Sequence, residues 1–138
     1  MKRTFSTEFD DFFITRIGPD AQTSTQFWGI LLNFRFTPVG GCQQEVKEHD
    51  NILWAFDAFN ANAFLKLDGP TLVRKEEDVA FIVTDGTSGK PIENASVSGS
   101  QTNINGQVDI QFRNAGVYGF KATKESAIRS NLVTVHVV

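Results

Sequence analysis

The chain has 138 residues, of which 41% are hydrophobic and 12% aromatic, and its formal net charge is −3. This length accommodates one average domain or two small ones, and the hydrophobic share is sufficient for a buried core, which excludes a disordered chain. Lysine and arginine residues are scattered along the sequence and are not clustered on one stretch. We therefore expect no binding surface for nucleic acid or for an anionic membrane.

The N-terminus does not have the pattern of an export signal. The basic start "MKR" is followed by "TFSTEFDD", whose acidic residues interrupt the apolar core that a signal peptide needs. No apolar run approaches the roughly 18 residues of a membrane-spanning helix. The single cysteine, Cys42, cannot form an internal disulfide. The chain therefore reads either as cytosolic or as a piece of a secreted protein whose partner cysteine lies elsewhere.

The first half of the chain alternates as β-strands do. The opening is ambiguous between helix and strand, and we favour a strand over 11–17. Between 26 and 36, one face of an extended strand carries Trp28, Ile30, Leu32, Phe34 and Phe36. "TPVGG" ends this strand, because proline lacks a ladder donor and Gly40 and Gly41 permit positive φ. "NILWAF" resumes the alternation, which predicts a hairpin-like pair around the loop of Cys42.

The second half has the strand and turn pattern of a β-sandwich. After a short turn, a strand is expected over 64–67, and "DGP" breaks it at 68–70. Four amphipathic strands follow, around Phe81, Ile110, Phe120 and Val135, joined by Asp-Gly, Ser-Gly, Asn-Gly and Ala-Gly turns. We place a boundary near 68–77 and predict an all-β protein of two domains, 1–72 and 73–138.

Residues 76–138 carry a recognisable pattern in "VAFIVTDGTSGKPIENASV", "TNINGQVDIQF", "AGVYGFKAT" and "RSNLVTVHV". This pattern resembles immunoglobulin-like or transthyretin-like modules of the carboxypeptidase-regulatory type. The resemblance implies an antiparallel β-sandwich with Tyr118 near the start of a core strand. Such modules usually serve as spacers, stability elements or binding platforms, and are not catalysts.

The first half, in "FWGILLNFRFTPVGGCQQEVKEHDNILWAF", resembles the transcobalamin-type C-terminal domain, which implies a β-grasp-like fold. His49-Asp50 stands where that pattern has Gly-Asp. Both halves together are similar to fungal extracellular or cell-surface proteins carrying "FDDFFI", "TPVGGCQ" and "LWAFDAFN" in this order. Those proteins typically have a longer N-terminus with a secretion signal. The resemblance implies an extracellular or cell-surface location, and the absence of a signal leaves a cytoplasmic location as the alternative.

Two further expectations depend on that location. If longer relatives carry a partner cysteine upstream, Cys42 is half of a disulfide. That disulfide is either intermolecular or missing here because the partner cysteine is missing. The alternative is that Cys42 is a small buried residue in a cytosolic chain. Asn94 begins the sequon Asn-Ala-Ser in a turn-rich stretch. It is an N-glycosylation site if the chain is secreted.

The sequence offers little that is typical of catalysis or metal binding. Cys42 and His49 lack a predicted helix N-terminus that would lower the thiol pKa, so a structural loop is favoured over a nucleophile and base. The spacing of Glu45, Glu48, His49 and Asp50 matches no zinc or EF-hand pattern, and no metal or cofactor is expected. In an extended segment Asp10 and Asp11 point to opposite faces, unlike the paired carboxylates of glycosidases.

Aromatic residues of the first half are the remaining candidates for ligand contact. Aromatic rings bind sugars or corrin-like rings, and pockets combine apolar walls with a few polar groups. We predict ligand contacts from Trp28, Asn33, Trp54, Asp57, Phe59 and Asn60. The alternative is that Trp28, Trp54 and Phe56 form the core of the first domain.

These patterns favour a non-enzymatic binding or adhesion protein of the fungal cell surface or extracellular space, with a cell-wall glycan, a small molecule or another surface protein as partner. The first alternative is a small-molecule enzyme with a pocket between the domains. The second is a purely structural surface module, in which every aromatic residue belongs to the core.

Overall fold

The structure is a computed structural model that describes residues 1–138. Its only helical element is a 3-10 turn, η1, Ala58–Asn60, and the rest consists of strands and their connections. The all-β class predicted from the alternating pattern is thus confirmed. The chain divides into two compact units, Met1–Ala61 and Asn62–Val138. No helix is long and apolar enough to cross a membrane.

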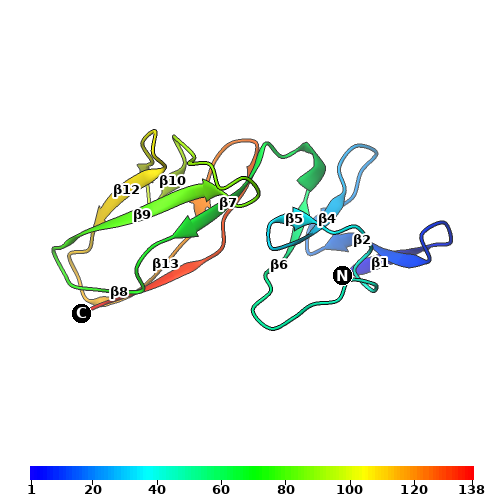
Figure 1. The fold of residues 1–138 in the computed structure, drawn as a ribbon, viewed down its shortest axis with the longest axis horizontal. Coiled ribbons are helices and arrows are strands. Elements are labelled where there is room, and N and C mark those ends of the chain that lie inside the picture. Colours follow the sequence, from blue (N-terminus) through cyan, green and yellow to red (C-terminus); the bar gives the residue numbers. More distant parts are fainter. The chain divides into compact units, whose positions relative to one another are not determined.

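The first unit contains two three-stranded antiparallel sheets (Figure 1). One sheet has the order β1–β2–β3, formed by Lys2–Ser6, Asp11–Ile17 and Asp20–Ala21. The other has the order β5–β4–β6, formed by Arg35–Phe36, Trp28–Leu32 and Ile52–Phe56. The strand predicted over 11–17 is confirmed residue for residue, and β4 and β6 form the antiparallel pair predicted around the Cys42 loop.

Two expectations for this unit were wrong. The run 26–36 is not one strand, because Asn33 and Phe34 adopt positive φ (51° and 64°) and turn the chain back from β4 into β5. In addition, Trp28, Trp54 and Phe56, which were the alternative core of this domain, are not its most buried residues. Leu31 and Ala55 are buried (0% and 4% exposed), whereas the opposite face, with the pairs Trp28–Phe56 and Ile30–Trp54, is only half-buried.

The second unit has two larger sheets and one small one. The four-stranded sheet has the order β12–β9–β7–β15, from Gln107–Gln111, Asp78–Asp85, Ala63–Asp68 and Ala127–Ile128. A three-stranded sheet has the order β13–β16–β8, from Gly116–Phe120, Val133–Val137 and Leu72–Val73. A small sheet has the order β11–β10–β14, from Ser100–Gln101, Ser96–Val97 and Ala122–Thr123.

Alternating side chains of these sheets build one hydrophobic core. Every second residue of β9 and β16 is buried, as expected for strands with one face against a core and one in water. Phe81, Val83 and Val135 are fully enclosed there, and the cluster also draws Leu65 and Leu67 from β7. The four amphipathic strands predicted from the sequence all contribute to this sandwich-like arrangement.

The division between the units lies earlier than the boundary expected near 68–77. It falls between Ala61 and Asn62, because β7 is hydrogen-bonded to β9 from Leu65 through Asp68. Strand β8 also joins this unit, in parallel pairing with β16. The sequence between 62 and 72 therefore supplies strands to the second unit instead of closing the first.

Candidate functional site

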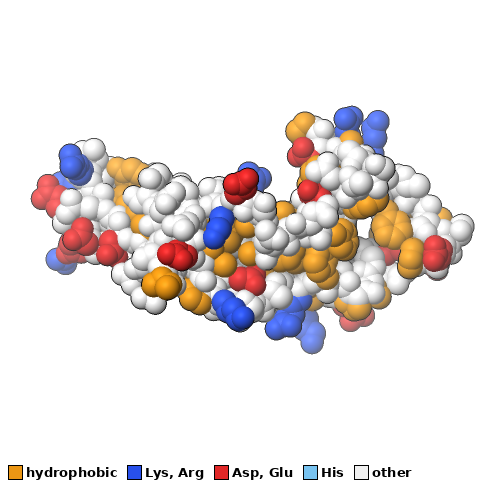
Figure 2. Space-filling view, turned by 90° about the horizontal axis from the view of Figure 1, so that it is seen from above, with side chains coloured by type: hydrophobic (Ala, Val, Ile, Leu, Met, Phe, Trp, Pro, Cys, Tyr) orange, Lys and Arg blue, Asp and Glu red, His pale blue; other side chains and the backbone are white.

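The aromatic residues of the two units differ in exposure. Phe64, Phe81 and Phe112 of the second unit are buried. In the first unit six phenylalanines are at least 42% exposed: Phe5, Phe9, Phe13, Phe27, Phe36 and Phe59. Figure 2 shows hydrophobic side chains at the surface of this unit, on the right of the view. Exposed aromatic residues gathered on one small unit are typical of an interaction site, whereas isolated ones are ordinary.

These rings are packed against one another. Phe36 and Phe59 stack with ring centroids 4.9 Å apart and planes 10° apart. Phe9 and Phe13 meet edge to face at 5.7 Å. Such contacts hold the rings in defined orientations, so the surface they present is preformed.

Two cavities open among these rings. The first, here called the tryptophan groove, has a volume of about 380 Å³ and is lined by the aromatic residues Phe9, Phe12, Phe13, Trp28, Phe36, Trp54 and Phe59, together with Asp11 and the segment 37–41. The second, here called the hairpin cavity, has a volume of about 370 Å³ and lies against β1 and β2. Phe13, Trp28 and Phe59 line both. Each volume is sufficient for a small ligand.

Two glycines, Gly40 and Gly41, allow the loop that lines the groove to pack closely against β2 and β6. A Cβ atom at Gly40 would overlap the carboxylate of Asp11, and one at Gly41 would lie 3.0 Å from the Trp54 ring. Neither glycine has positive φ, so that part of the expectation was wrong, although a turn does begin at Gly40, whose oxygen accepts the Gln43 N–H. They are required for close approach of the loop to β2 and β6.

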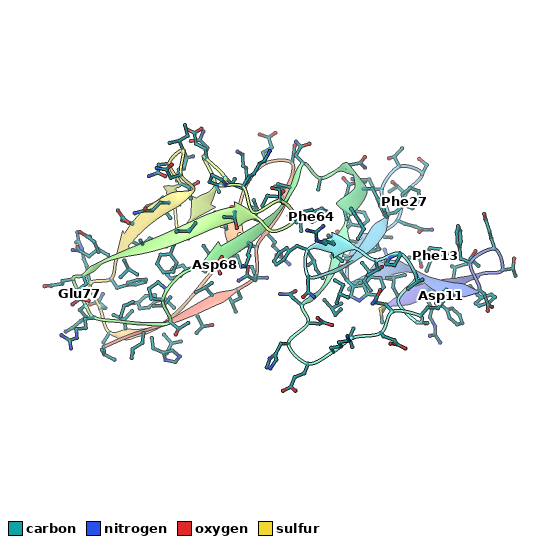
Figure 3. The ribbon with its side chains drawn as sticks, viewed as in Figure 1. Asp11, Phe13, Phe27, Phe64, Asp68 and Glu77 are labelled. Carbon is teal, nitrogen blue, oxygen red and sulfur yellow. The ribbon has the colours of Figure 1, made fainter.

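Asp11 is the one charged residue that lines the tryptophan groove, and the hairpin cavity has none. Only 3% of Asp11 is exposed. Its Oδ1 accepts the backbone N–H of Phe12 at 2.7 Å, whereas its Oδ2 is buried without a hydrogen-bond partner. Figure 3 labels Asp11 and Phe13, both on β2. A buried carboxylate oxygen without a donor is uncommon in folded proteins and is costly in free energy.

Cys42 follows Gly41 on the loop and is exposed and free. The carboxyl of the neighbouring Asp11 is the main cause that raises the Cys42 pKa, and desolvation adds to it. A thiol is a weak donor, and it makes no hydrogen bond of full geometry to Oδ2. The raised pKa disfavours the thiolate that a nucleophile requires.

His49 lies beside Glu48, with 3.6 Å between Nε2 and Oε1, and both side chains are 89% exposed. Asp50 accepts hydrogen bonds from Asn33 and from the backbone of Lys47, and these lower its pKa. No group of three histidine, cysteine, aspartate or glutamate side chains is arranged to hold a metal ion. The acidic stretch after Cys42 is therefore a hydrogen-bonded surface loop.

Three of the six predicted contact residues, Trp28, Trp54 and Phe59, line the tryptophan groove. Trp28 donates its indole N–H to the backbone oxygen of Asp20 at 3.2 Å, which fixes its ring. Phe59 is 64% exposed and belongs to η1. The aromatic half of the predicted set therefore comes together in one place.

Asn33, Asp57 and Asn60 line neither cavity. The side-chain oxygen of Asn33 accepts the backbone N–H of Asn51 at 2.9 Å, a hydrogen bond that links the end of β4 to the start of β6. Asp57, at φ 58°, accepts hydrogen bonds from the amides of Asn60 and Gln26, which lower its pKa. These polar residues fix the turns that carry the aromatic rings.

The sequence prediction missed Asp11 and the phenylalanines of β2. The signal available was the density of phenylalanine in "FDDFFI", beside a strand already predicted there. Nothing in the sequence indicated that Asp11 would be buried, because its burial comes from the distant Gly40.

Asn94 is exposed in the second unit, with φ 58° and its backbone N–H bonded to the Thr102 oxygen at 2.9 Å. The sequon thus lies at a surface turn, where a glycan would meet little obstruction.

No protein-family model matches this chain, and comparisons with curated proteins and with solved structures find no significant similarity.

Proposed function

We propose that the chain is a non-catalytic binding module whose first unit captures a ligand in the tryptophan groove. The observation that carries this proposal is the contrast in exposure: three of the four phenylalanines of the second unit are buried, whereas six of the nine in the first are exposed around two cavities. Because these rings are only partly buried, each forgoes part of the about 1.5–3 kcal/mol that its full burial would contribute. A bound ligand with a flat apolar face recovers part of that free energy.

We further propose that the second unit is an immunoglobulin-like or transthyretin-like support. Its core strands alternate as that resemblance implies. In addition, the Tyr118 hydroxyl, near the start of β13, donates to the backbone oxygen of Asn114 at 2.9 Å. A tyrosine near a strand start that bonds back to the preceding chain is a recurring feature of immunoglobulin-type sandwiches. For the first unit, the two sheets support the β character of the transcobalamin-type resemblance more than its β-grasp topology.

The extracellular or cell-surface location proposed from the resemblance is consistent with the exposed sequon at Asn94. In that setting the ligands to test are soluble wall oligosaccharides and small ring-bearing molecules, because both present flat apolar faces to aromatic side chains.

The first experiment titrates the full chain with phenethyl alcohol and, separately, with soluble chitin and glucan oligosaccharides, and follows tryptophan fluorescence and thermal unfolding. A ligand at about one hundred times its Kd is expected to stabilise the folded chain by about 2.7 kcal/mol. Because both tryptophans line the groove, occupancy should also change their emission.

The matched variants are Phe59→Ala and Leu72→Ala, which shorten two similarly exposed side chains (64% and 67%), one at the groove and one in the second unit. We expect Phe59→Ala to weaken binding at least tenfold and Leu72→Ala to leave it unchanged. If no probe alters fluorescence or stability, the groove is not a site for these ligand classes and the proposal is wrong.

A further inference from the structure

The lining of the tryptophan groove carries a single charged group, and its charge is negative. Asp11 is its only charged lining residue, and Oδ2 of this side chain has no partner. The donors nearby are committed elsewhere or weak. The Phe12 N–H bonds to Oδ1, and the Gln43 amide donates to the backbone oxygens of Phe9 and Asp10. The Cys42 thiol lies beside the carboxyl but makes no hydrogen bond of full geometry to Oδ2. The groove lining therefore contains an acceptor that no strong donor of the chain satisfies.

No cation of the chain forms an ion pair with this carboxylate. The Arg3 guanidinium lies over the ring of Phe12, 4.2 Å from its centroid, and forms no ion pair with Asp11. Phe12 itself lines the groove. One ring of this wall thus already holds a cation on its face, which is the interaction that aromatic surfaces offer to positively charged ligands.

Resting on the proposed function above, we propose that the tryptophan groove selects ligands that carry a protonated primary amine on an apolar, ring-bearing body. The ammonium group donates to Oδ2 of Asp11, and the ring lies against Trp54 and Phe59. A hydrogen bond between two charged groups is stronger than one between neutral groups, and one formed away from water is stronger still. Aromatic faces around the carboxylate add cation–π attraction.

Access to Oδ2 requires a small movement of the loop. The atom is covered by Gly40, whose carbonyl oxygen accepts the N–H groups of Gln43 and Gln44. The amine displaces this glycine from the carboxylate. Since Gly41 rests against the Trp54 ring, the displacement also changes the surroundings of that indole. Amine binding is therefore expected to alter tryptophan emission more than binding of a neutral ring does.

The test compares three probes of similar shape on the full chain: phenethylamine, phenethyl alcohol and hydrocinnamate. Affinity is measured at neutral pH by calorimetry and by tryptophan fluorescence. In the unmodified chain we expect phenethylamine to bind at least tenfold more tightly than the alcohol, and hydrocinnamate to bind more weakly than either. This order requires no variant, so it stands as a test even if substitution of Asp11 disturbs folding.

The variant arm uses Asp11→Asn, with Asp10→Asn as the matched control. Both remove one negative charge, but Asp10 is exposed and does not line the groove. Asp11→Asn should reduce phenethylamine affinity at least tenfold and abolish the preference for the amine over the alcohol, and Asp10→Asn should preserve that preference.

The outcomes separate the two proposals. Equal binding of amine and alcohol overturns the selection for amines and leaves the binding groove intact. Selection for amines is likewise overturned if Asp10→Asn and Asp11→Asn weaken amine binding equally. The amine would then be attracted only by the net negative charge of the chain and not by Asp11 in the groove. If none of the three probes binds, both the amine selection and the groove as a small-molecule site are wrong.

Discussion

Asp85, at the end of β9, shows how a single carboxylate organises a turn. It accepts hydrogen bonds from the backbone N–H groups of Phe64 and Thr87 and from the Ser88 hydroxyl. Burial alone would raise the pKa of Asp85, but these hydrogen bonds outweigh burial and hold it below the ordinary value of 3.8. The ionised form is therefore favoured by folding.

The sign of this shift predicts a pH dependence. A carboxyl whose pKa is lower in the folded state contributes stability above its unfolded pKa and loses that contribution as the pH falls through the folded pKa. We expect Asp85→Asn to lower the free energy of unfolding at pH 7 and the difference from the unmodified chain to shrink below about pH 4. Urea unfolding of both proteins at a series of pH values measures this difference in the free energy of unfolding. A difference that is constant with pH would exclude an ionic role for Asp85.

Gly40 and Gly41 illustrate what a residue-level reading misses. Their sequence predicts a turn, since adjacent glycines after a proline often adopt positive φ. In the structure the turn forms without positive φ, and the glycines are needed because they bring the loop close to Asp11 and Trp54. Contacts between residues so far apart in sequence depend on tertiary packing, which no local pattern encodes.

At the scale of elements, the strands were more predictable than their faces. The alternation located β4, β6 and the four strands of the sandwich, and the density of strand-forming residues located β2. In β4, however, apolar residues occur on both faces, so a period of two cannot decide which face is buried. The larger side chains of Trp28 and Ile30 favoured one face, and the structure buries Leu31 on the other.

Leu31 in β4 is the largest fully buried side chain of the first unit. We expect Leu31→Ala to destabilise that unit by about 2–5 kcal/mol, the range for a buried leucine truncated in a packed core. Denaturant unfolding followed by tryptophan fluorescence measures the loss, because both tryptophans belong to this unit.

The control is Ile52→Ala in the neighbouring strand β6, where the side chain is 38% exposed. It should cost markedly less than Leu31→Ala. Equal losses at the two positions would mean that Leu31 does not mark the core of this unit.

At the scale of the whole molecule, the two units differ in how much they bury. The core cluster of the second unit includes residues from seven of its strands and the fully enclosed ring of Phe81. The buried hydrophobic residues of the first unit are Leu31, Ala55 and Ala58. Since burial of apolar surface is the main favourable term in folding, the second unit should be the more stable one.

We therefore expect residues 62–138, expressed alone, to fold and to unfold cooperatively, and the full chain to lose its tryptophan signal at a lower temperature than its total β-structure. Circular dichroism and fluorescence melts of both proteins measure this. A single coincident transition in the full chain would show that the units unfold together and that their stabilities are coupled.

The exposed thiol of Cys42 has a practical consequence. It is the only cysteine of the chain, and the residues on either side of it, Gly41 and Gln43, both line the tryptophan groove. A maleimide dye attached there would sit at the rim of the groove with no competing site elsewhere. Because the thiol pKa is raised, labelling should proceed faster in mildly alkaline buffer. The chain thus carries a natural attachment point for an optical sensor of groove occupancy.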